Sequence, residues 1–75
     1  MEDSEELIGY ARRENEEYRR LEREHRELDE RIKQYFGSVK HLTPVEEVKK
    51  KTLQKQKLAK KDRMFEILHD LKAAV

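Results

Sequence analysis

The chain has 75 residues, of which 47% are charged and 35% hydrophobic, with a formal net charge of +1 and no cysteine. This length allows one small domain, and the lack of thiols excludes disulfides and thiolate metal sites. Disordered chains and long surface helices share such a composition, so hydrophobic periodicity has to decide between them.

Charge is divided unevenly along the chain. Residues 1–38 carry 8 basic and 12 acidic side chains, whereas residues 39–75 carry 10 basic and 5 acidic ones. Oppositely charged halves favour a fold in which the two halves lie against each other. The N-terminus is acidic and lacks the apolar stretch of a signal peptide, and no apolar run reaches the length of a membrane span. We therefore expect a cytoplasmic protein.

Residues 4–36 are predicted to form one long helix. Asp3 or Ser4 can cap its start, while Gly9 weakens its early part by about 1 kcal/mol relative to alanine. Apolar side chains, interrupted by Glu14 and His25, recur at alternating gaps of three and four. This is the spacing of a stripe of residues along a helix that packs against a partner helix, and we call the stripe the seam. This seam comprises Leu7, Ala11, Glu14, Tyr18, Leu21, His25, Leu28, Ile32 and Tyr35.

A break is predicted at residues 37–43. Gly37 suits the left-handed backbone that often ends a helix. A complete start signal follows, in which Thr43 is the N-cap, Pro44 takes the first helical position and Glu46 closes a capping box. The next helix should therefore begin at Pro44.

The second helix is predicted over residues 44–74. Two helices of about thirty residues with a short connection predict an all-α, coiled-coil-like, antiparallel two-helix hairpin. The hairpin forms a single domain over residues 1–75. The pairs expected from a bend near residue 40 are Leu21 with Leu58, Ile32 with Val48, and Ala11 with Leu68.

The second helix has a less regular seam and a surplus of apolar residues. Its expected seam residues are Val45, Val48, Thr52, Leu58 and Phe65. In its last third, apolar side chains cover an arc too wide for one partner helix. The residues of this arc outside the seam are Met64, Ile67, Leu68, Leu71 and Val75. We expect them to mediate self-association, so that the chain forms a homo-oligomer and a larger helical bundle.

Two segments resemble the YdcH-like family of small bacterial helical hairpins. Residues 21–32 read LEREHRELDERI and are similar to L-x-x-x-H-x-x-L-D-x-x-I, and residues 55–64 read KQKLAKKDRM and are similar to K-x-K-L-x-L-K-D-x-[IM]. The match runs from about Leu21 to Leu68 and departs at Lys60, where the family tends to carry an apolar residue. The resemblance implies a helical-hairpin fold in a bacterial protein, and no assigned activity.

Two Glu-x-x-His pairs, Glu22–His25 and Glu66–His69, have the spacing found in carboxylate-bridged dimetal bundles. In the expected hairpin the pairs lie about 20 Å apart along the axis, and Glu22 falls off the seam that holds His25. We interpret them as a chance match, and predict no metal, other cofactor or catalytic residue.

His25 occupies a seam position, where two roles are open. It either forms a polar layer that fixes the alignment of the helices, as a buried Asn does in a coiled coil, or acts as a pH-sensitive residue. We favour the alignment role. A pH titration of thermal stability with His25→Leu alongside separates the two.

A basic segment of the second helix raises the question of nucleic-acid binding through phosphates. Its cations are Lys49, Lys50, Lys51, Lys55, Lys57, Lys60, Lys61 and Arg63. They spread nearly all around the helix, and no aromatic residue interleaves with them to stack on bases. We therefore expect a non-enzymatic protein–protein interaction or scaffold module that acts on an unidentified protein partner through helix faces. RNA binding by the Lys-rich second helix is the alternative.

Overall fold

The computed structural model describes residues 4–74, which form three α-helices and contain no β-strand. The helices are α1 (Ser4–Glu14), α2 (Glu16–Phe36) and α3 (Pro44–Ala74). The all-α fold class is confirmed, but three helices replace the predicted two-helix hairpin. Within the described residues, no helix is long and apolar enough to cross a membrane. Two predicted residues, the cap Asp3 and the apolar Val75, lie outside the described part.

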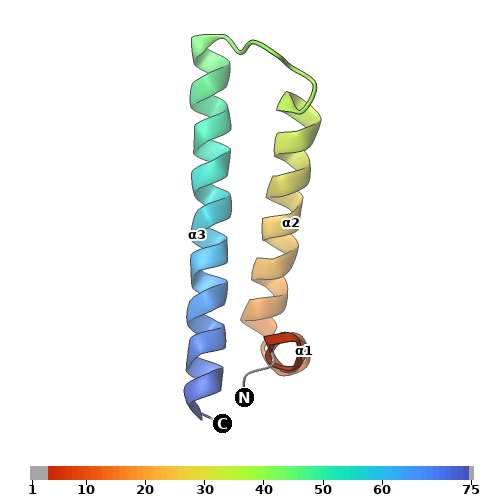
Figure 1. The fold of residues 1–75 in the computed structure, drawn as a ribbon, viewed down its shortest axis with the longest axis vertical. Helices are drawn as coiled ribbons and strands as arrows, with labels where there is room; N and C mark the ends of the chain where they lie inside the picture. The colour runs from red at the N-terminus through yellow and green to blue at the C-terminus, as the bar shows by residue number, and fades with distance from the viewer. Residues whose placement is uncertain (1–3, 75) are drawn as a thin grey trace.

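The arrangement is an antiparallel helix pair with a short helix across its base. α2 and α3 run side by side along the long axis, and α1 lies across the lower end of the pair, where it is seen end-on (Figure 1). The Cα atoms extend 48 × 21 × 16 Å along the principal axes. The connection between α2 and α3 crosses the opposite end of the molecule.

Asn15 interrupts the helix predicted over residues 4–36. Its backbone is extended (φ −123°, ψ 109°), and its Oδ1 accepts a hydrogen bond from Tyr18 N at 2.8 Å. Asparagine suits this N-cap position because its short side chain satisfies an amide that has no helical acceptor. The prediction of a single long helix was therefore wrong, and the chain bends at this cap.

Arginine side chains hold the bend between α1 and α2. Arg19 Nη1 donates to the carbonyl oxygens of Arg12 (2.8 Å) and Arg13 (3.0 Å), which lie in the last turn of α1. Arg12 in turn forms a bidentate pair with Glu22, with Nη2–Oε2 at 2.7 Å and Nε at 3.0 Å from both carboxylate oxygens. These contacts join α1 to the first two turns of α2.

The connection between α2 and α3 confirms the capping box and corrects the predicted end of α2. Thr43 N donates to Glu46 Oε1 (2.9 Å), and Glu46 N donates to Thr43 Oγ1 (3.2 Å). Gly37, however, is right-handed (φ −63°, ψ −33°). Its N–H donates to the Lys33 carbonyl oxygen, and a Cβ on residue 37 would clash with that oxygen. Glycine is thus required for a close approach of backbone atoms.

The register between α2 and α3 differs from the prediction. Lys57 Nζ lies 2.9 Å from Asp29 Oδ1, and Lys60 Nζ lies 3.2 Å from Glu24 Oε1. At this level of the pair, these contacts displace α3 by about five residues, or roughly 8 Å, from the predicted alignment, whereas the Glu17–Arg63 contact nearer α1 stays close to it. The cause is the connection, because residues 37–43 slope from the end of α2 to a start of α3 that lies further along the axis (Figure 1).

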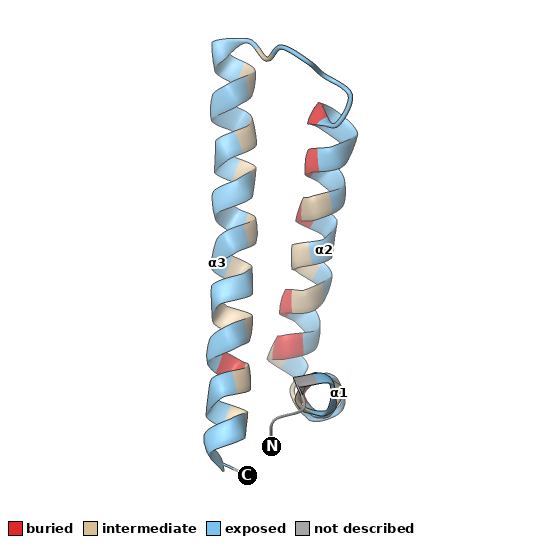
Figure 2. Cartoon of the chain, in the orientation of Figure 1, coloured by how far each residue is buried: buried red, intermediate tan, exposed pale blue. Residues whose placement is uncertain are grey.

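The core lies mainly where the three helices meet. There, Ala11, Tyr18, Leu21 and Ile67 are buried, and Ile8, Met64, Leu68 and Leu71 pack against them. Towards the connection, α2 also buries Leu28, Ile32 and Phe36. Figure 2 shows the buried positions of α2 along its edge facing α3, whereas most of the α3 surface is exposed. The other helices therefore cover α3 on one side only.

Candidate interaction surface

α3 turns a different face towards α2 than the predicted one. Its inward positions recur at gaps of four and three: Leu53, Lys57, Lys60, Met64, Ile67 and Leu71. Ile67 is the one buried residue among the described residues of α3. Lys57 and Lys60 are half-buried, because their alkyl stems lie along the helix pair while their ammonium groups reach carboxylates of α2.

The predicted seam residues divide into two groups. Ala11, Tyr18, Leu21, Leu28 and Ile32 are buried, and Leu7 and His25 are partly buried. The structure contradicts the seam assignment of Tyr35 (61% exposed), Val48 (65%), Leu58 (57%) and Phe65 (57%). The predicted pairs Leu21–Leu58 and Ile32–Val48 are accordingly wrong. Lys57 and Lys60 occupy the seam of α3 instead, and the displaced register turns Val48, Leu58 and Phe65 outwards.

The apolar arc predicted for self-association is used within the chain. Ile67 is 4% exposed, and Met64, Leu68 and Leu71 pack against the same cluster. Their partner is α1, which the bend at Asn15 brings back across the ends of α2 and α3. The expectation that these side chains face another copy is therefore corrected, because α1 occupies their surface.

Large apolar side chains remain exposed on two other faces of α3. Val45 (64% exposed) and Val48 lie near the connection, and Leu58 and Phe65 lie two turns apart further along. At 100° per residue, the two pairs project roughly 120° apart. Lys61 Nζ lies 5.9 Å from the centre of the Phe65 ring and partly covers it. No single α2-like neighbour could cover both faces.

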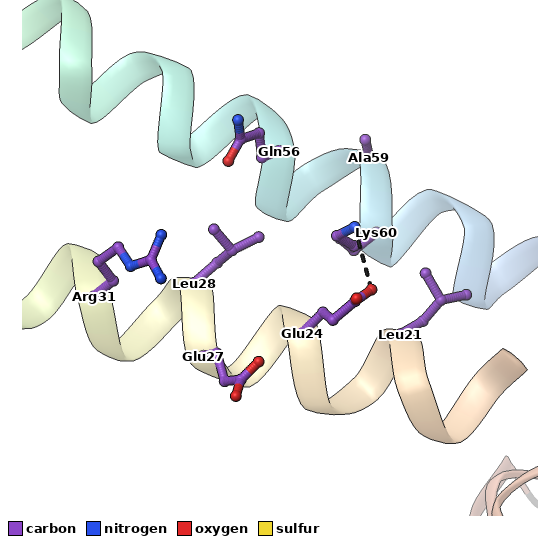
Figure 3. A pocket seen from close by; sticks show the side chains of 8 residues that line it. All are labelled: Leu21, Glu24, Glu27, Leu28, Arg31, Gln56, Ala59 and Lys60. Atoms are coloured by element: carbon purple, nitrogen blue, oxygen red, sulfur yellow. Dashed lines mark ion pairs between the residues drawn. The ribbon is translucent and has the colours of Figure 1, made fainter. Parts of the chain in front are cut away.

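A groove follows α2 and α3 on the side of Val48, and we call it the α2–α3 groove. Two hollows of about 590 and 430 Å³ form it and share Arg31. The first is lined by Leu21, Glu24, Glu27, Leu28, Arg31, Gln56, Ala59 and Lys60, and the second by Arg31, Tyr35, Phe36, Val48, Lys49, Thr52 and Leu53. Figure 3 shows Leu21 and Leu28 directed between the helices, while Glu27 points away from α3. In the first hollow the floor is thus apolar and the rims are mostly polar.

Ion pairs connect α2 and α3 along their length. They are Glu17–Arg63, Glu24–Lys60 and Asp29–Lys57. Hydrogen bonds from Lys57 and Lys33 lower the pKa of Asp29 from 3.8 to about 2, and hydrogen bonds from Arg63 lower the pKa of Glu17. Since the side chains of these pairs keep 30–43% of their surface exposed, the pairs specify register more than they add stability.

The residues considered for metal binding do not converge. Among the described residues, no three His, Asp or Glu side chains lie close enough together to hold a metal ion. Glu22 is engaged by Arg12, and His69 is exposed on α3. His25 is partly buried in the seam of α2, and its role as an alignment layer stays a prediction.

The basic segment of α3 is partly neutralised within the chain. Lys57, Lys60 and Arg63 form the ion pairs with α2. Lys49, Lys51, Lys55 and Lys61 are exposed, but they point in several directions around the helix. The cations therefore form no single stripe along α3.

Two buried or inward residues were missed by the sequence reasoning. Leu53 lines the groove and lies on the inward face of α3, and Phe36 is buried at the end of α2. A signal for Leu53 was present, because stepping back from Ile67 at gaps of three and four reaches it through Lys60 and Lys57. Lysine at a seam position is compatible with helix packing when its stem is covered.

No family model, curated protein or solved structure matches this chain. The resemblance to the YdcH-like family stays a prediction that rests on residues 21–32 and 55–64. These two segments lie in α2 and α3, respectively.

Proposed function

We propose that this chain is a small non-enzymatic interaction or scaffold module that binds other proteins through its helix faces. The observation that carries the proposal is a set of large apolar side chains that remain 57–65% exposed. They are Tyr35, Val45, Val48, Leu58 and Phe65. Concentrations of exposed apolar surface on a small protein mark interaction sites. Because α3 buries so little of its surface within the chain, most of its length is available to a partner.

The family resemblance concerns the same two helices. Both resembling segments fall in the antiparallel α2–α3 pair, and this pair carries the exposed apolar faces. We therefore include in the proposal that the chain is a bacterial, cytoplasmic member of the YdcH-like family of helical hairpins.

Affinity capture from the native cell tests the function, with one variant for each apolar face. One variant is Tyr35→Asp with Val48→Asp, and the other is Leu58→Asp with Phe65→Asp. These side chains are exposed, so each variant is expected to keep the helical circular dichroism of the wild type. At least one variant should lose a protein that the wild type retains, and the loss should recur with that protein purified. Retention of every bound protein by both variants would contradict the proposal.

A matched control and a salt titration sharpen this experiment. Gln34→Asp with Ser38→Asp introduces the same two charges at exposed polar positions and should retain all partners. The alternative function, RNA binding through exposed cations such as Lys49 and Lys55, predicts binding that weakens steeply with salt. Salt-dependent RNA binding that both apolar-face variants retain would favour that alternative.

A further inference from the structure

We propose that a second copy of the chain covers the α2–α3 groove. The two copies form an antiparallel four-helix bundle with a two-fold axis along the long axis of the molecule, so that α2 of each copy lies against α3 of the other. This inference rests on the proposed function and deepens it, because it names the partner of one apolar face. The Leu58–Phe65 face stays outside the contact.

The shape of the groove fits a partner of the same shape. The groove lies between two antiparallel helices and follows α2, whose 21 residues extend about 31 Å. With helices about 10 Å wide, this two-helix face offers roughly 600 Å² per copy, which is the size of a weak interface and suits a dimer that forms at micromolar to millimolar concentration. Two such layers of two helices pack together as a four-helix bundle. Leu21, Leu28 and Leu53 on the groove floors would then form its shared core.

The two-fold axis determines which residues meet. An axis parallel to the helices exchanges the copies without shifting them lengthwise, so each level of α2 meets the same level of the partner's α3. The pairs Asp29–Lys57 and Glu24–Lys60 show which levels correspond. Glu27 therefore lies within one turn of the partner's Lys55.

Glu27 and Lys55 have the positions that such a contact requires. Glu27 is exposed on the groove rim and points away from its own α3 (Figure 3). Lys55 is exposed and lies two turns from Val48 on the same side of α3. Within one chain these side chains project from opposite outer edges, whereas in the bundle they face each other across the contact between copies.

A second pair of opposite charge lies further along the same rims. Arg20 precedes Glu27 by two turns of α2, and Glu66 projects from α3 in the direction of Val48, five turns along. By the correspondence at Glu24–Lys60, Arg20 lies within one turn of the partner's Glu66. On either side of Lys55, α3 presents Thr52 and Ala59 in this direction, and their small side chains allow the helices to approach closely.

The apolar residues at the connection end complete the match. Tyr35 and Val48 stand on opposite rims of one hollow, and each is more than 60% exposed. A two-fold contact buries the same patch on both copies, so one interface buries this hollow in each of the two chains. Opposite charges at matching levels and an apolar patch at one end therefore make this face complementary to itself.

Sedimentation equilibrium of the full chain at low salt, from micromolar to millimolar concentration, tests the proposal by charge exchange. The wild type should sediment as a dimer. Glu27→Lys and Lys55→Glu should each weaken dimerisation by roughly tenfold, since each creates two like-charge contacts, and combining them should restore it to within about threefold. A combined variant as weak as the sum of the single changes would overturn the proposal.

Apolar variants provide a second measurement with an internal control. Tyr35→Asp with Val48→Asp should give a monomer, whereas Leu58→Asp with Phe65→Asp, on side chains of comparable exposure, should remain a dimer. The reverse result, or a wild type that is monomeric throughout, would overturn the inference. If the wild type is monomeric but partner capture still depends on either apolar face, the proposed function stands without the dimer.

Discussion

Replacing Asn15 with alanine tests whether α1 and α2 are two helices or one. Asn15 Oδ1 accepts the hydrogen bond from Tyr18 N that caps α2. Removing an N-cap of this kind costs about 1 kcal/mol of stability. In a single helix over residues 4–36, the same change would instead replace a poor helix former with the best one and add roughly 0.5–0.7 kcal/mol. The two folds therefore predict opposite signs.

Thermal unfolding followed by far-UV circular dichroism measures this sign. For a chain of 75 residues, a loss of about 1 kcal/mol lowers Tm by roughly 4–8 °C. All proteins should be compared at one concentration, because self-association makes Tm depend on concentration. Asn15→Ser retains a capping oxygen and should stay close to the wild type. Gln34→Ala reports the effect of alanine at an exposed position inside α2.

An increase in Tm for Asn15→Ala, similar to that of Gln34→Ala, would refute the bend. A decrease shared equally by Asn15→Ser would also refute the reasoning, because serine keeps the cap. In either case the Asn15 cap would not separate α1 from α2.

Three further substitutions test the packing of α3, the helicity of α1 and the main ion pair. Ile67→Ala should lower the urea-unfolding free energy by about 2–5 kcal/mol, whereas Phe65→Ala should change the stability of the monomer by less than about 0.5 kcal/mol; equal losses would contradict the assigned face of α3. Gly9→Ala should raise stability by roughly 1 kcal/mol, since a Cβ there meets only a side-chain nitrogen at 3.6 Å, and an unchanged Tm would argue against a helical α1. Because the pKa of Asp29 is lowered from 3.8 to about 2, its contribution is complete above about pH 4 and is lost as the pH falls towards 2. The Tm of the wild type should therefore fall more than that of Asp29→Asn between these pH values, and parallel curves would show that the contact with Lys57 does not form.

The stripe of α2 and the start of α3 could be predicted because local signals sufficed. Tyr18, Leu21 and Leu28 recur at helical spacing and are buried. Thr43 and Glu46 form the capping box that their spacing indicates. Each of these features depends on residues within a few turns of one another.

The bend was missed because the seam spacing continues through it. Ala11 and Tyr18 are seven residues apart in the sequence whether the helix is continuous or bent, so the periodicity of the sequence does not respond to the break. The signal that could have shown it was local, namely Asn15 followed by two glutamates in the first turn of α2. Because the bend was missed, α1 was not recognised as the cover for Ile67.

The interaction surface could not be predicted because it depends on the register. The tight end of α2 at Gly37 and the path of residues 37–43 set the offset between the helices. That offset decides whether Leu58 or Met64 lies at the level of Leu21. Periodicity alone ranks both as apolar residues of one helix and does not distinguish the partly buried one from the exposed one.

The neighbours of Leu21 in solution distinguish the observed register most directly. A NOESY experiment on methyl-labelled protein should give cross-peaks from the Ile67 methyl groups to Leu21 and to the Tyr18 ring, because these side chains share one buried cluster. It should give no cross-peak between Leu21 and Leu58, which is 57% exposed on another face of α3. Cross-peaks from Leu21 to Leu58 in place of Ile67 would show that the helices take the alignment predicted from the sequence. In that case the α2–α3 groove and the surface built on it would not exist.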